Sequence, residues 1–225
     1  MLTLKGDTAL SWRTSLAVLL AACFAAQDGS AEVYQGIEPL MSPGDVRGLF
    51  PGATFEWPQP AWAQEADKIM KVTGPGIKGT IIVKFNDSRP AARAALASLN
   101  ASETLADSVK EYMRAFWTEQ TELTDDEAIE TEWVRWVPEE PIPLTWLTGK
   151  YGVPDTRGFN DQTFEPYRQW TKRAVLASIG SDTTMVRLVE FQYTKTEYAR
   201  VYHDKFGVWP YGYSPPEKGH KRVKH

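Results

Sequence analysis

Residues 80–99 read TIIVKFNDSRPAARAALASL, a strand-like run that passes directly into a helix-like run. Ile81, Val83 and Phe85 occupy alternate positions, which is the two-residue period of a β-strand with one buried face. The Ser-Arg-Pro sequence at 88–90 then starts a helix, and alanine and leucine recur behind it at helical spacing. A strand followed at once by a helix indicates a fold that mixes both kinds of element.

The same alternation predicts strands on either side of this stretch. They are expected around Ala53–Trp57, Lys68–Val72, Arg173–Ile179 and Met185–Tyr193. Gly74-Pro-Gly-Ile-Lys-Gly79 fits the three-glycine pattern of dinucleotide sites, but that pattern needs a helix after it. Here a strand follows and Pro75 lacks a backbone donor, so we expect a hairpin turn.

Several sequences are typical of helix starts. Ser42-Pro-Gly-Asp45 combines a hydroxyl N-cap with an early proline. Thr124 and Thr194 each stand three residues before a glutamate, Glu127 and Glu197, which is the spacing of a capping box. Helices are expected after Ser42, after Ser88, after Ser102, from Thr124 to Val137, over Leu144–Tyr151 and from Thr194 to Gly207.

Two of these helices carry long apolar stripes that we expect to be buried. The stripe after Ser102 is Leu105, Val109, Met113, Phe116 and Trp117. The stripe after Thr194 is Tyr198, Val201, Tyr202 and Phe206.

These elements predict an α+β fold with antiparallel sheet and helices packed on one face. A short helix, strands and a further helix occur twice along the chain, which suggests two similar halves. We place the halves at residues 32–122 and 123–214. Residues 215–225 are basic and lack apolar content, so we expect a disordered tail there.

The N-terminus has the pattern of an export signal. Lys5 and Arg13 precede the uncharged apolar run Leu16–Ala26, which is shorter than the roughly 18 residues needed to span a bilayer. Gly29-Ser-Ala31 offers small residues for ordinary cleavage after Ala31, which would remove residues 1–31.

A second processing route competes with this one. Leu20-Ala-Ala-Cys23 matches the site at which bacterial lipoproteins are cut and lipidated, so that residues 1–22 would be removed and Cys23 acylated. Cys23 is the only cysteine, and both routes leave a mature chain without a free thiol. We expect a periplasmic or secreted protein, with a membrane-anchored lipoprotein as the alternative.

Ser42–Gly52 and Leu144–Pro154 are both short helical segments that end in glycine and proline before a run of strands. In this order of elements the chain resembles the helix-plus-antiparallel-sheet module of BamE-type outer-membrane assembly lipoproteins and of the β-lactamase-inhibitor protein, which carries the module twice. The resemblance implies a fold and assigns no functional residue, because one fold serves many functions.

We find no motif for a catalytic, cofactor or metal site, and we expect none of these groups. His220 and His225 lie in the expected tail, and His203 is expected on a solvated helix face. The acidic residues between Glu119 and Glu132 lack the order of a calcium loop and suit a solvated helix start. Most tryptophans are expected in the core. Trp209–Tyr213 either folds back on the core, which we expect, or forms an exposed aromatic contact.

The formal net charge of −4 argues against nucleic acid as a partner. We expect an exported binding or structural protein without catalytic activity, whose partner is an unidentified protein or small molecule. The alternatives are a secreted or periplasmic hydrolase that uses carboxylate or serine groups, and a secreted enzyme inhibitor. No transmembrane span is expected; membrane association would be a lipid anchor at Cys23 or a weak surface contact of the basic tail. Carboxylates, or a serine and His203, that converge in a cleft would favour the hydrolase.

Overall fold

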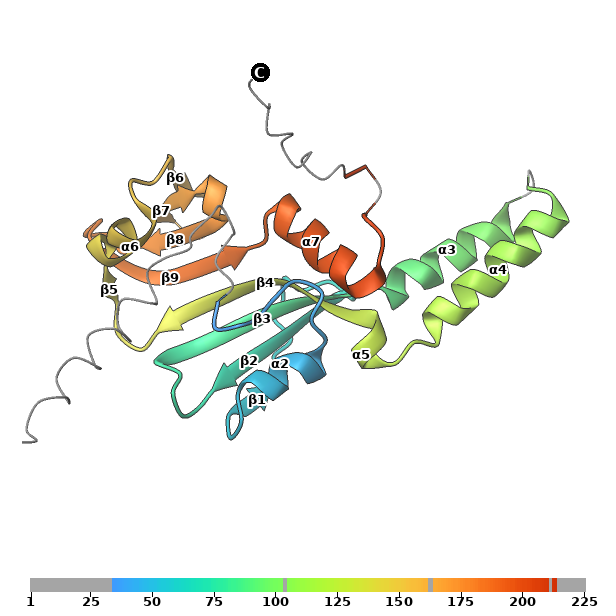
Figure 1. Cartoon of the computed structure of the whole chain (residues 1–225), viewed down its shortest axis with the longest axis horizontal. Coiled ribbons are helices and arrows are strands. Elements are labelled where there is room, and N and C mark those ends of the chain that lie inside the picture. The colour runs from blue at the N-terminus through green and yellow to red at the C-terminus, as the bar shows by residue number, and fades with distance from the viewer. Residues whose placement is uncertain (1–33, 103–104, 162–163, 211, 214–225) are drawn as a thin grey trace, which may run out of the picture. The chain divides into compact units, whose positions relative to one another are not determined.

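The computed structural model describes residues 34–102, 105–161, 164–210 and 212–213. The export signal with Cys23 and Ala31, and the tail at 215–225, lie outside these residues and stay predictions. Within the described residues the fold is α+β, as predicted, with helices around one antiparallel sheet of nine strands (Figure 1). None of the described helices is long and apolar enough to cross a membrane.

The strands are β1 (Thr54–Glu56), β2 (Asp67–Thr73), β3 (Gly79–Asp87), β4 (Ile129–Pro138), β5 (Ile142–Pro143), β6 (Thr156–Asn160), β7 (Glu165–Trp170), β8 (Val175–Ile179) and β9 (Met185–Gln192). The helices are α2 (Pro43–Leu49), α3 (Arg89–Ala101), α4 (Asp107–Thr121), α5 (Asp125–Ala128), α6 (Leu144–Tyr151) and α7 (Lys195–Phe206), with a 3-10 turn, η1 (Thr171–Arg173).

Two antiparallel meanders meet at the centre of the sheet. The strand order is β1-β2-β3-β4-β9-β8-β7-β6, and β5 pairs beside β9. The meanders join where β4 pairs with β9, with Trp133 opposite Gln192 and Trp136 opposite Val189. Each meander contributes its last strand to the junction, so one continuous sheet runs through the molecule.

The alternation in β3 divides the sheet into two faces. Ile81, Val83 and Phe85 are fully buried on one side, which we call the core face. Side chains of the intervening residues point to the other side, which we call the open face. By the register of the pairing, Lys84 of β3, Trp133 and Arg135 of β4 and Glu190 of β9 lie on this open face.

The main core lies between the core face, two short helices and the segment before α2. Val46 of α2, Leu147 of α6 and Ile37 are fully buried in one cluster with the sheet residues. Ser42 caps α2 as predicted, because its hydroxyl accepts from the Asp45 backbone N–H at 3.1 Å. The helices α2 and α6 therefore pack on the core face, as predicted, whereas the start of α7 lies beside the open face.

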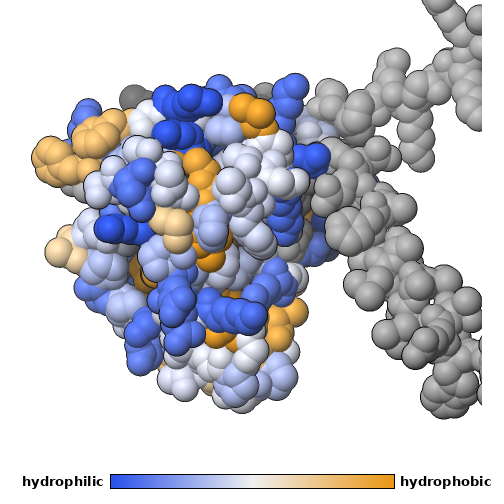
Figure 2. Space-filling view, turned by 90° about the vertical axis from the view of Figure 1, so that its left-hand side faces the viewer, coloured by the Kyte–Doolittle hydropathy of each residue, from blue (hydrophilic) through white to orange (hydrophobic). Residues whose placement is uncertain are grey.

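The side of the molecule that carries α6 and the strands β6 to β8 is mainly hydrophilic (Figure 2). Its apolar side chains form small patches that hydrophilic residues separate (Figure 2). Exposed Trp146, Val153, Phe159 and Phe164 belong to this half of the sequence. Phe159 and Phe164 contact each other, with ring centroids 6.5 Å apart. Small groups of exposed apolar residues are normal for a protein surface and mark no binding site by themselves.

The helix expected from Thr124 to Val137 is wrong over most of its length. Thr124 is the N-cap as predicted, and the Glu127 carboxylate accepts from its backbone N–H at 3.0 Å and from its hydroxyl at 2.8 Å. However, α5 ends at Ala128, and the following residues form the central strand β4. This segment is rich in β-branched and aromatic residues, and its pairing with both β3 and β9 outweighs the helical spacing of its tryptophans.

The apolar stripe after Ser102 was expected to be buried, and this prediction is wrong. Ser102 is the C-cap of α3, and α4 begins after Ala106. α3 and α4 pack against each other as an antiparallel pair, so α4 has one main neighbour (Figure 1). No described residue of α4 is buried: Met113 and Trp117 are half-buried, whereas Val109 and Phe116 are 44% and 47% exposed.

The buried stripe predicted on α7 is also wrong, although the predicted start and end of the helix are confirmed. The Thr194 hydroxyl accepts from the Glu197 backbone N–H, and Gly207 ends the helix with φ of 74°. The buried residues of α7 are Glu197 and Ala199, whereas Tyr198 and Phe206 are exposed.

The glycine-rich sequence at 74–79 connects β2 to β3, which confirms the predicted turn. Gly79 has φ of +116°, and a Cβ there would lie 2.2 Å from the Val137 carbonyl oxygen. The sequence did not reveal β5, β6 or β7. β6 and β7 lack clear alternation, and glycine, asparagine and proline interrupt them.

Candidate functional site

A cavity of about 1040 Å³ lies between the open face of the sheet, the start of α7 and the segment at 210–213. Strands β2, β3, β4 and β9 supply one wall of this cavity, and Thr194, Lys195, Tyr198 and Ala199 supply another. Charged, amide and aromatic side chains line it together: Asp67, Lys84, Glu130, Glu132, Lys195, Gln64, Asn86, Gln192, Trp133, Tyr193, Tyr198 and Tyr213.

Lys84 lies between two carboxylates in the wall of the cavity. Its Nζ is 3.0 Å from Asp67 Oδ1 and 2.7 Å from Glu132 Oε2. Burial alone would lower the pKa of Lys84, but hydrogen bonds to Glu132 and Asp67 outweigh it and raise that pKa. The Gln64 backbone N–H, helped by Lys84 and opposed by burial, lowers the pKa of Asp67. Lys84 and Asp67 are therefore both charged at neutral pH.

Beside this triad, Trp133 forms a nearly buried part of the wall, with 9% of its surface exposed. The Arg135 guanidinium lies over the Trp133 ring at 4.1 Å from its centroid, and Arg135 Nε donates to Glu190 Oε2 at 2.6 Å. Gln192 Nε2 donates to the other oxygen of Glu190. These contacts fix the orientation of the indole ring.

At the side of the cavity, α7 and the residues just before it are attached to the segment before α2. The Tyr193 hydroxyl donates to the Ile37 carbonyl at 3.2 Å, and Lys205 Nζ donates to the Leu40 carbonyl at 3.0 Å. Burial raises the pKa of Glu197 to about 7, and Glu197 Oε2 has no hydrogen-bond partner among the described residues. This buried carboxylate lies next to the cavity but does not line it.

His203 does not line the cavity either. Its ring stacks on Trp209 at 4.2 Å between centroids, and its Nδ1 lies 3.7 Å from Asp204 Oδ1. Trp209 in turn contacts Tyr213, with ring centroids 5.5 Å apart. Trp209 and Tyr213 thus fold back onto α7 and not onto the core as expected, and Trp209 is 39% exposed. Tyr211 lies outside the described residues.

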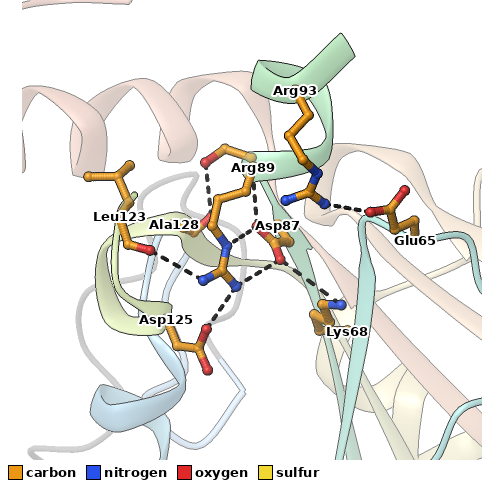
Figure 3. Close-up of polar contacts among 9 residues, drawn as sticks. Glu65, Lys68, Asp87, Arg89, Arg93, Leu123, Asp125 and Ala128 are labelled. Carbon is orange, nitrogen blue, oxygen red and sulfur yellow. Dashed lines mark hydrogen bonds and ion pairs between the residues drawn. The ribbon is translucent and has the colours of Figure 1, made fainter. Parts of the chain in front are cut away.

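A second polar cluster attaches α3 to α5 (Figure 3). Arg89 donates to both oxygens of Asp87 at 2.9 Å, to Asp125 at 2.7 Å and to the Leu123 carbonyl at 3.2 Å. Arg93 and Glu65 form an exposed ion pair nearby (Figure 3). Arg89 and Asp125 also line a smaller cavity of about 370 Å³. Every charge in the cluster has a protein partner, which is typical of a structural role.

The acidic residues at 119–132 do not act as one group. Asp125 binds Arg89, Asp126 accepts from the Gly44 backbone N–H, and Glu127 caps α5. Glu130 pairs with Lys205, and Glu132 with Lys84. The described residues contain no cluster of three or more histidine, cysteine or acidic residues that could hold a metal ion.

Sequence reasoning did not single out Asp67, Lys84, Asn86 or Lys195. Lys84 breaks an otherwise apolar strand, which was the available signal that this strand has a second, polar face. A comparison with family models, curated proteins and solved structures finds no significant match. We therefore infer the function from the geometry of the cavity.

Proposed function

We propose that this chain is an exported, non-catalytic binding protein that takes its ligand in the cavity beside α7. The observation that carries the proposal is the position of Lys84, between Asp67 and Glu132. Carboxylates that converge on a lysine ammonium satisfy its charge and are themselves satisfied by it.

Acid–base catalysis needs a group whose pKa lies near the working pH. Both pKa values are instead moved away from neutral pH: the Gln64 backbone N–H and Lys84 lower the pKa of Asp67, and hydrogen bonds to Glu132 and Asp67 raise the pKa of Lys84. Neither group then exchanges a proton readily near neutral pH. His203, the other candidate, lies against Trp209, outside the cavity lining. This arrangement favours binding over the hydrolase alternative.

The test combines ligand binding with a search for turnover. Lys84→Gln removes the ammonium but keeps a polar side chain of similar length. Lys110→Gln on α4, outside the cavity lining, is the matched control. We expect Lys84→Gln to lose ligand-induced thermal stabilisation while its circular dichroism stays unchanged, and Lys110→Gln to behave as the parent protein.

The same proteins are incubated with chromogenic ester, glycoside and peptide substrates. We expect the parent protein and Lys84→Gln to give the same background rate. Turnover by the parent protein that Lys84→Gln or Asp67→Asn abolishes would contradict the proposal and establish the hydrolase alternative.

A further inference from the structure

The charges around the cavity balance. Asp67, Lys84 and Glu132 together carry one net negative charge, and Lys195 adds one positive charge. Glu130 is neutralised by Lys205 at 3.1 Å. An anionic ligand would meet three carboxylates, and a cationic ligand would meet Lys84 and Lys195. The lining therefore favours a ligand without net charge.

Donors and acceptors lie side by side in the triad. Lys84 has three N–H donors and uses two of them on Asp67 and Glu132. Glu132 binds Lys84 through Oε2, and its side chain is 46% exposed in the lining of the cavity. A hydroxyl group both accepts and donates, so one hydroxyl can bind Lys84 and Glu132 at once through charge-assisted hydrogen bonds.

Amide and aromatic groups extend this pattern. Gln64 and Asn86 each offer hydrogen-bond donors and an acceptor, and Asn86 is exposed. Tyr198 and Tyr213 add apolar ring surface to the same lining, and Trp133 adds its small exposed edge. Rings beside hydrogen-bonding groups suit a ligand that alternates hydroxyl groups with C–H surface.

We propose that the cavity binds a neutral polyhydroxylated ligand, namely a saccharide of two or more sugar units. This inference rests on the proposed binding function of the cavity. Its volume of about 1040 Å³ is at the upper end of the range for small-molecule pockets, which leaves room for more than one sugar ring. An extended peptide commonly binds by adding to a free strand edge. Of the strands that line the cavity, β4 pairs with β9 only from Trp133 to Trp136, and β1 covers β2 only from Lys71 to Thr73. The free side of β4 at Thr131 is taken by backbone hydrogen bonds with Leu40 and Met41.

The experiment titrates the purified protein with neutral oligosaccharides of two to six units, from the malto-, cello-, xylo- and chito- series, and measures heat or chemical-shift changes. Acidic oligogalacturonides and a mixture of short peptides are titrated in parallel. We expect saturable binding of at least one neutral series. Tyr198→Ala and Asn86→Ala should each raise the Kd tenfold or more, whereas Tyr112→Ala on α4 should leave it unchanged.

Pelleting with insoluble cellulose or chitin distinguishes a polymer from a free sugar as the natural source. Binding to a polymer that Tyr198→Ala abolishes supports the same site with a polymeric ligand.

Tight binding of peptides or oligogalacturonides at the cavity, without binding of neutral sugars, would overturn the saccharide inference and leave the proposed binding function standing. Sugar binding that neither Tyr198→Ala nor Asn86→Ala weakens would place the sugar elsewhere and overturn the inference. Sugar hydrolysis by the parent protein would instead contradict the proposed non-catalytic function.

Discussion

At the scale of single residues, Glu197 is the least satisfied charge that the structure describes. It is 5% exposed, and Oε2 has no hydrogen-bond partner among the described residues. Burial raises the pKa of Glu197, and Glu38 adds to this effect, whereas the Thr194 backbone N–H and Arg200 lower it. Burial outweighs both, so the proton of Glu197 is held until about pH 7.

This gives Glu197→Gln a pH-dependent effect. Between the ordinary pKa of 4.5 and about 7, the folded protein keeps a proton that the unfolded chain has released, so the free energy of unfolding falls as pH rises through this window. Because glutamine does not titrate, the variant does not lose this free energy of unfolding as pH rises. We expect the variant to be more stable than the parent at pH 8, by roughly 1–3 kcal/mol, and similar to it at pH 4. Urea denaturation at both pH values measures this, and Glu111→Gln on α4 is the exposed control.

Asp87 shows the opposite case, a buried carboxylate with a partner. It is 4% exposed, and burial would raise its pKa, but Arg89 outweighs burial and lowers it. We expect Arg89→Ala to cost about 3 kcal/mol, because it leaves the Asp87 charge buried, with Lys68 4.0 Å away as its remaining ion pair. Arg93→Ala, which breaks the exposed pair with Glu65, should cost less than about 1 kcal/mol.

The Arg89 contribution also depends on pH in a defined direction. Because the folded pKa of Asp87 is lowered, its stabilising effect is present at neutral pH and is lost as acid protonates the folded carboxylate. The difference between the parent protein and Arg89→Ala should therefore shrink below about pH 4. Equal losses in the free energy of unfolding for Arg89→Ala and Arg93→Ala would show that this cluster does not hold α3 in place.

At the scale of elements, short sequence signals predicted where helices begin better than they predicted which faces are buried. The caps at Ser42, Thr124 and Thr194 are correct, because a cap depends on a few neighbouring residues. The central strand β4 was missed because pairing on both sides decides its conformation, and its partner β9 lies about fifty residues later in the chain. The cavity follows from that same pairing, since it brings Trp133, Lys84 and Gln192 together.

The helix pair α3 and α4 offers a test of which apolar residues are core. Leu99 of α3 is buried, whereas Phe116 of α4 is 47% exposed despite its place in the apolar stripe. We expect Leu99→Ala to cost 2–4 kcal/mol and Phe116→Ala less than about 1 kcal/mol in urea denaturation. Similar losses for both would mean that the exposed side of α4 is covered in solution.

At the scale of the whole molecule, the described core depends on residues from Ile37 onward. Ile37, Val46, Leu147 and the sheet residues of the core face form one cluster. The proposed ligand cavity likewise uses residues between Leu40 and Tyr213. The core cluster and the cavity lining that the structure describes are therefore both made of residues that follow the predicted export signal.

The two processing routes predict different results for Cys23→Ser in a bacterial host. If cleavage follows Ala31, the exported protein starts at Glu32, and the substitution leaves its mass unchanged, because residue 23 lies in the discarded segment. If Cys23 is lipidated, the parent protein carries an acylated N-terminus and partitions with membranes, and Cys23→Ser loses both properties. Mass spectrometry of the periplasmic, membrane and cytoplasmic fractions distinguishes the two. An intact N-terminus recovered from the cytoplasm for both proteins would contradict export by either route. The saccharide would then have to be an intracellular one, because the cavity would meet its ligand inside the cell.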